Sequence, residues 1–130
     1  MIKRLRLSDA VPFCVETSYL PQHRIPGLVA ADVFAAPSLY ALLRERFGMT
    51  FATSDFHVSV AAAPEIEADL LGLAPGVGAL AMRSTVYDRD GQPAEFLISW
   101  NHPDRVAFES LRDDAGPVKS VFTDWASPTP

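Results

Sequence analysis

Apolar and polar residues alternate along the first part of the chain, and this alternation predicts a β-hairpin. Residues 3–8 and Val11–Tyr19 each alternate with a period of two, which is typical of strands with one buried face. The short polar segment between them, Ser8-Asp9-Ala10, supplies the turn. The two strands are therefore expected to pair as neighbours.

The two faces of this hairpin differ in character. Side chains of a strand point alternately to opposite faces, so Leu5 and Leu7 share one face of the first strand, where we expect core packing. Arg4 and Arg6 share the other face. In the second strand, Glu16 lies on the face opposite to the row that begins at Val11, together with its polar neighbour Ser18 and with Cys14.

Helical spacing and turn residues divide the remainder into helices and strands. Leucines recur at helical intervals from Leu39 onward, and Gly48 ends that pattern. The dipeptide Asp90-Gly91 predicts a second hairpin. The expected elements are a helix at 38–47, a long strand at 50–62, a helix at 64–71, and strands at 80–87, 95–101 and 106–111.

This order of elements predicts an α+β fold: a mostly antiparallel β-sheet with helices packed on one face. A chain of 130 residues suits one compact domain, which we place at 1–112. Residues 113–130 turn polar and are expected to form a poorly ordered C-terminal tail.

Composition narrows the classes of function. A net charge of −5 without a Lys/Arg cluster argues against direct contact of this chain with DNA. No apolar run approaches the ~20 residues of a membrane span, and the first ten residues lack the apolar segment of a signal peptide, so we expect none. The single cysteine, Cys14, excludes an internal disulfide, fits a cytoplasmic protein, and is expected to be a buried, inert thiol.

Catalytic and metal chemistry have no support in the sequence. The three histidines lie far apart, and none has an acid or cysteine at metal-ligand spacing. No serine occupies a nucleophile elbow, and the PGVG at 75–78 leads into a strand instead of opening a helix. We therefore predict no catalytic residue, no metal and no cofactor.

Two glutamates, Glu16 and Glu95, are unusual because they interrupt apolar strands. They and the two arginines of the first strand could be edge-strand charges or ion pairs within the sheet. Alternatively, they share one face of the sheet and form a polar pocket for a small molecule. Arginine suits a bidentate contact with phosphate or carboxylate, and a carboxylate accepts hydrogen bonds from ligand donors. By alternation Ser99 and Asn101 lie on the same face as Glu95.

Several motifs, in the same order along the chain, resemble a known family. They are R-x-R-L at 4–7, E-x-S-Y-L-P at 16–21, PGL at 26–28, SLYALLRERFGM at 38–49, EIEADLLGLAPGVGAL at 65–80 and VYDRDGQPAEFLISWNHPDRVAF at 86–108. Together they are similar to the UTRA domain, the effector-binding half of HutC-type regulators in the GntR superfamily. The match covers nearly the whole chain.

The resemblance implies a chorismate-lyase-like fold that senses a ligand, dimerises, and changes the DNA affinity of a preceding winged helix-turn-helix. Arg4 and Arg6 match arginines that hold an anionic group, with Ser38 and Tyr40 contacting the same group. Glu16 and Glu95 match acids that meet the polar body of the ligand. The predicted effector site comprises Arg4, Arg6, Glu16, Ser38, Tyr40, Glu95, Ser99 and Asn101. The expected ligand is a small anionic metabolite, either a sugar phosphate or a carboxylate.

The sequence departs from the family pattern in three places. The winged helix-turn-helix, and the family's first strand with its serine-bearing anion loop, would precede Met1, so we expect a fragment or a stand-alone sensor whose pocket lacks one wall. Asn101 stands where the family often has an aromatic hydroxyl. His102-Pro103 replace a basic residue and a glycine. Two alternatives to the sensor are a chorismate-lyase-like enzyme and a dimerisation module with a vestigial pocket.

Overall fold

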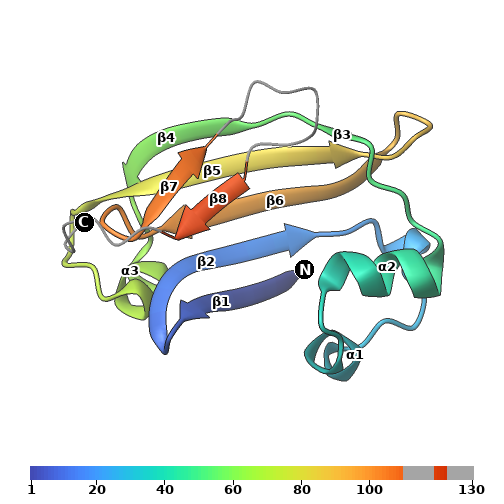
Figure 1. The fold of residues 1–130 in the computed structure, drawn as a ribbon, viewed down its shortest axis with the longest axis horizontal. Helices are drawn as coiled ribbons and strands as arrows, with labels where there is room; N and C mark the ends of the chain where they lie inside the picture. The colour runs from blue at the N-terminus through green and yellow to red at the C-terminus, as the bar shows by residue number, and fades with distance from the viewer. Residues whose placement is uncertain (110–118, 123–130) are drawn as a thin grey trace, which may run out of the picture.

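A six-stranded antiparallel sheet forms the body of the protein (Figure 1). The computed structural model describes residues 1–109 and the strand at 119–122. The sheet runs in the order β1-β2-β6-β5-β3, and β4 also pairs with β5. Its strands are β1 (Ile2–Ser8), β2 (Val11–Tyr19), β3 (Thr53–Ser54), β4 (His57–Ala62), β5 (Gly78–Tyr87) and β6 (Pro93–Asn101). The predicted α+β class with a mostly antiparallel sheet is confirmed.

The three α-helices of the described residues lie at the two ends of the sheet, α1 and α2 at one end and α3 at the other (Figure 1). Their bounds are α1 (Ala30–Ala35), α2 (Leu39–Phe47) and α3 (Glu65–Leu71), and a short 3-10 turn, η1, covers Gln22–Arg24. Ser38 begins α2 because its hydroxyl accepts a hydrogen bond from the N–H of Ala41 at 3.3 Å. Gly48 ends the helix with a φ of 64°, a left-handed conformation that costs glycine little. In the described part of the chain, no helix is long and apolar enough to cross a membrane.

One face of the sheet packs against α3. Val15 of β2, Ala79 of β5 and Leu71 of α3 belong to one buried apolar cluster, and Trp100 packs at its margin. An ion pair between Lys3 and Glu67 also ties β1 to α3. Burial of these side chains supplies hydrophobic stabilisation on this side of the sheet.

A second apolar cluster anchors α2 at the opposite end. Leu39 and Leu43 of the helix are buried with Met49 and Ala94, the latter at the start of β6. The ring of Tyr40 stacks on Phe51 with centroids 4.2 Å apart. This packing fixes the position of α2 beside the ends of β2 and β6.

The single long strand predicted at 50–62 is wrong, since the structure has two strands with a break at residues 55–56. The side chain of Asp55 accepts a hydrogen bond from the N–H of Thr85 at 2.6 Å, and its carbonyl accepts one from the Ser84 hydroxyl at 2.7 Å. The N–H of Asp55 also donates to the carbonyl of Thr85 at 3.1 Å, so side-chain bonds add to the backbone contact with β5 at this break.

The structure also places Leu5 and Leu7 differently from the expected core. Leu5 is 39% and Leu7 54% exposed. Both lie on β1, an edge strand, and Leu5 pairs with Val15 on the face that α3 covers. The apolar cluster that Val15 forms with α3 does not include Leu5, which remains partly accessible to solvent.

A separate two-stranded sheet ends the described chain. β7 (Val106–Glu109) pairs antiparallel with β8 (Lys119–Phe122). The strand predicted at 106–111 is therefore present to residue 109, and its last two residues lie outside the described part. β8 falls within the segment predicted to be a polar tail, where no strand was expected. The predicted boundary at residue 112 lies outside the described residues.

Candidate functional site

The register of the central strands brings the predicted polar residues onto one face. Arg4 pairs with Glu16 across β1 and β2, and Glu16 pairs with Ser99 across β2 and β6. Directly opposite residues of antiparallel strands project to the same side of a sheet. Glu95 lies on this face too, because it is four positions before Ser99 along β6 and side chains alternate between the faces with a period of two.

A cavity of about 1050 Å³ lies between this polar face and the segment that contains α1 and the start of α2. Its volume is slightly above the range typical of small-molecule sites, ~300–1000 Å³. Six of the eight predicted site residues line it: Arg4, Arg6, Glu16, Ser38, Tyr40 and Glu95.

Glu16 is the centre of an ion-pair cluster within the cavity. Its Oε1 atom lies 2.6 Å from Nη2 of Arg4 and 3.0 Å from Nη1 of Arg6. The Glu16 side chain is 12% exposed and that of Arg6 is 52% exposed. One carboxylate thus holds two guanidinium groups side by side, and donor atoms of Arg6 remain accessible from the cavity.

Glu95 has a different environment from Glu16. It is 2% exposed, and its Oε1 accepts a hydrogen bond from the hydroxyl of Tyr40 at 2.6 Å. Burial raises the pKa of Glu95, while the bond from Tyr40 and the charge of Arg4 act in the opposite direction. Burial also raises the pKa of Tyr40, as does the nearby Glu95, so that the phenol stays protonated and acts as the donor.

Ser99 and Asn101 are on the polar face but are not among the residues that surround the cavity in the described structure. Both are buried. The amide nitrogen of Asn101 donates to the Ser99 hydroxyl at 2.8 Å and to the carbonyl of Leu80 at 3.0 Å. They cross-link β6 and β5 beside the cavity, and a direct contact with a ligand stays a prediction.

Cys14 shares the polar face, since it pairs with Arg6 and Asn101 in the neighbouring strands. Desolvation, followed by the charge of Glu16, raises the pKa of its thiol to about 12. A thiol with such a pKa is protonated at neutral pH and is a poor nucleophile. Among the described residues, no group of three or more His, Cys, Asp or Glu side chains is arranged to hold a metal ion.

The sequence analysis missed the apolar wall of the cavity. This wall includes Ile25, Leu28, Val29, Val33 and Phe34, which come from the segment around α1. The spacing of Val29 and Val33, four residues apart, is a weak helical signal in a six-residue element. A helix this short lacks the repeated apolar stripe on which helix prediction depends.

These features describe an α+β domain with a ligand-sized cavity on the polar face of its sheet. The chain belongs to the UTRA domain family, whose model matches residues 1–107. The resemblance found in the sequence motifs is therefore confirmed, and with it the fold. Assignment to the HutC group stays a prediction.

The similar proteins are transcriptional regulators. The chain is 31% identical over 108 residues to the HTH-type transcriptional regulator Rv0792c of Mycobacterium tuberculosis. The aligned residues make up 82% of this chain and 40% of that protein. Across the curated relatives that it matches, the chain spans 40–45% of their length.

Several solved structures have a fold similar to that of this chain. PhnF from Mycobacterium smegmatis superposes with a TM-score of 0.76 at 30% identity, over 87% of this chain and 49% of that one. The ligand-binding domain of a GntR-family regulator from Bordetella bronchiseptica gives a TM-score of 0.74 at 25% identity, over 78% and 66% of the two chains. The fold of this chain is thus that of GntR-family ligand-binding domains.

Proposed function

We propose that the cavity binds a small anionic effector and that the chain is the sensing half of a GntR-type transcriptional regulator, without catalytic activity. The observation that carries this proposal is the cluster of Arg4, Arg6 and Glu16 in the wall of a ligand-sized cavity. The naming of its relatives as transcriptional regulators supports a regulatory role.

The position of the cavity provides a route for regulation. Its walls come from β1, β2 and β6 on one side and from the segment leading into α2 on the other. A ligand that contacts both walls favours the arrangement in which they are correctly spaced, and so shifts the population of conformations. We propose that this shift, transmitted through a homodimer, changes the DNA affinity of a winged-helix domain.

The binding half of the proposal is tested with a substitution at Arg6. Sugar phosphates and carboxylic acids are titrated into the chain by calorimetry, and the tightest ligand is carried forward. Arg6→Ala should weaken its binding by about 1.5–3 kcal/mol, the usual contribution of a hydrogen bond to a charged group.

The matched control is Arg83→Ala, because Arg83 is an exposed arginine of the same sheet that pairs with His57 and Ile98, away from the cavity. This variant should bind like the wild type. An equal loss in both variants, or no loss in Arg6→Ala, would contradict the proposed site.

A further inference from the structure

The two walls of the cavity differ sharply in polarity. The charged and hydrogen-bonding side chains come from β1, β2, β6 and Tyr40. The opposite wall, at residues 25–39, is apolar except for Ser38, and its large side chains are Ile25, Leu28, Val29, Val33, Phe34 and Leu39. A ligand that fills the space between these walls therefore meets a polar surface on one side and an apolar surface on the other.

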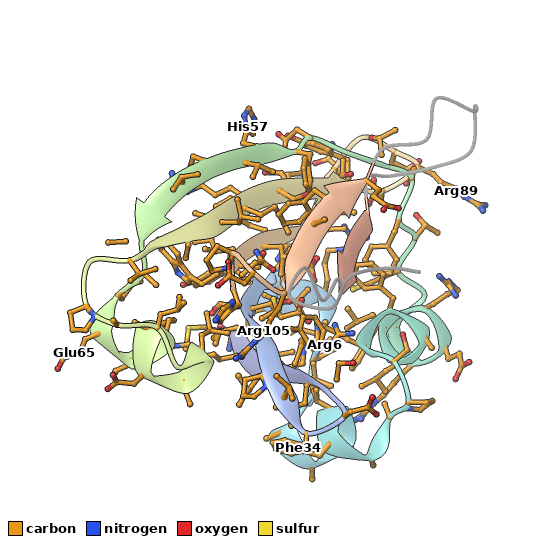
Figure 2. The ribbon with its side chains drawn as sticks, turned by 60° about the vertical axis from the view of Figure 1, so that its left-hand side comes forward. Arg6, Phe34, His57, Glu65, Arg89 and Arg105 are labelled. Carbon is orange, nitrogen blue, oxygen red and sulfur yellow. The ribbon has the colours of Figure 1, made fainter. Side chains whose placement is uncertain are left out.

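The apolar wall is accessible in the absence of ligand. Phe34 is 87% and Val29 56% exposed, although both line the cavity. Within α1 (Ala30–Ala35) none of the six residues is buried. Figure 2 shows Phe34 on α1 at the lower edge of the molecule, below Arg6. Several apolar residues exposed together beside a cavity are typical of a surface that binds an apolar group.

Arg46 holds this wall in place from α2. It forms an ion pair with Asp32 of α1 at 2.6 Å and donates a hydrogen bond to the carbonyl of Gly27 at 3.3 Å. The side chains of α1 that face the cavity are thus positioned by contacts on another part of the helix, and they remain available to a ligand.

The ion-pair cluster of the polar wall carries a single excess positive charge. The other charged residues of this wall have partners outside the cluster: Lys3 pairs with Glu67, and Glu95 is bonded to the Tyr40 hydroxyl. Two guanidinium charges, from Arg4 and Arg6, face the one carboxylate of Glu16. Among the residues that the structure describes, the buried Nε–H of Arg4 has no hydrogen-bond acceptor. One further negative charge completes the neutralisation of this cluster, whereas a phosphate monoester brings a charge of about −1.5 to −2 beside Glu16.

We infer that the effector is an amphipathic monoanion: a carboxylate attached to an aliphatic chain or ring. Its carboxylate binds Arg4 and Arg6, and its apolar part packs against Val33 and Phe34. This inference rests on the proposed function and chooses between the two ligand classes that the sequence left open.

Four probes separate these contributions when titrated into the full chain and followed by amide NMR shifts. Nonanoate carries both parts, acetate carries the head group alone, and 1-octanol carries the chain alone. Glucose 6-phosphate is a polar dianion. Nonanoate should shift residues that line the cavity and bind at least about tenfold more tightly than any of the other three, since each ~1.4 kcal/mol of contact is tenfold in affinity.

Two substitutions locate the parts of nonanoate. Phe34→Ala should weaken its binding about fivefold through lost apolar contact, and Arg6→Ala about tenfold or more through the lost charged partner. Ile66→Ala is the matched control, because Ile66 is a 65% exposed apolar residue on α3 and is not among the residues that line the cavity. It should leave nonanoate binding unchanged, which also excludes general adhesion of the chain to apolar surface.

A pair of ligands with equal chain length tests the charge argument. Octyl phosphate and nonanoate share an eight-carbon chain, and the monoanion should bind more tightly to the wild type. Glu16→Gln removes one negative charge from the cluster, so it should raise the affinity for octyl phosphate relative to nonanoate.

The outcomes distinguish this inference from the proposed function. If glucose 6-phosphate binds the cavity as tightly as nonanoate and depends on Arg6 but not on Phe34, the amphipathic ligand is wrong and the anionic effector site stands. Nonanoate binding that is equal in the wild type and in Phe34→Ala would also overturn the inference. If none of the anions perturbs the cavity residues, both proposals fail.

Discussion

The two faces of the main sheet are formed by the same strands but differ in role: one packs against α3, and the other lines the cavity. On the α3 face, Val15 and Ala79 pack with Leu71 in an apolar cluster. On the cavity face, the adjacent position of β2 carries Glu16, and Glu95 is almost fully buried. Burial of a carboxyl group costs free energy unless the group is hydrogen-bonded or paired. The cavity face therefore contributes less to the free energy of unfolding than the apolar α3 face does.

The two carboxylates meet this cost in different ways. Glu16 is paired with Arg4 and Arg6, whereas Glu95 receives a hydrogen bond from the neutral Tyr40. A buried acid whose pKa is raised, as that of Glu95 is, occurs more often in binding and catalytic sites than in plain cores. The difference between the faces therefore separates variants that should affect folding from variants that should affect binding.

The largest effect is expected on the α3 face. Leu71→Ala should lower the free energy of unfolding by about 2–5 kcal/mol, because Leu71 is fully buried in the cluster with Val15. Urea denaturation followed by circular dichroism measures this change. The folded fraction should retain the ligand affinity of the wild type, and a loss of affinity without loss of stability would show that the two faces are not independent.

A smaller effect is expected from the pH dependence of Glu95. Burial raises its pKa in the folded state above the ordinary value of 4.5, so the folded state holds this proton more tightly than the unfolded state. The stability that protonated Glu95 contributes is present below pH 4.5 and is lost as the pH rises through the raised folded pKa. Glu95→Gln cannot titrate, so over this interval it should become progressively more stable relative to the wild type in denaturation experiments.

Tyr40→Phe sharpens this test. The bond from Tyr40 favours the charged form of Glu95, so its removal should raise the pKa of Glu95 further. Carbon NMR of the Glu95 carboxyl group follows the titration directly. A pKa that falls in Tyr40→Phe, or a wild type and Glu95→Gln with parallel pH profiles, would contradict this description of the buried acid.

Local rules predicted the strands and their faces because period-two alternation needs only neighbouring residues. The grouping of Arg4 with Arg6, and of Glu95 with Ser99, depends on one strand each. Whether the groups meet depends on the pairing of β1 with β2 and of β2 with β6, which are long-range contacts. The family resemblance supplied this step, and the register in the structure agrees with it.

The features that the sequence did not predict are those that depend on tertiary contacts. α1 has six residues, too few for a helical stripe, and it is held by Arg46 from another helix. Ser99 and Asn101 lie on the polar face as alternation predicted, and their hydrogen bonds to one another and to Leu80 could not be predicted from one strand; their contact with a ligand stays a prediction. Neither outcome follows from periodicity alone.

The smallest effect, at Leu5, tests the limits of the comparison between faces. Alternation places Leu5 on the face of Val15, and a core position there would lose about 2–5 kcal/mol on truncation to alanine. Leu5 is instead 39% exposed on an edge strand, so truncation removes a side chain that is already partly in water. Leu5→Ala should cost at most about 1 kcal/mol in urea denaturation, close to the range of surface substitutions. A loss as large as that of Leu71→Ala would mean that the apolar face extends to the edge strand in solution and that β1 is covered there by another surface.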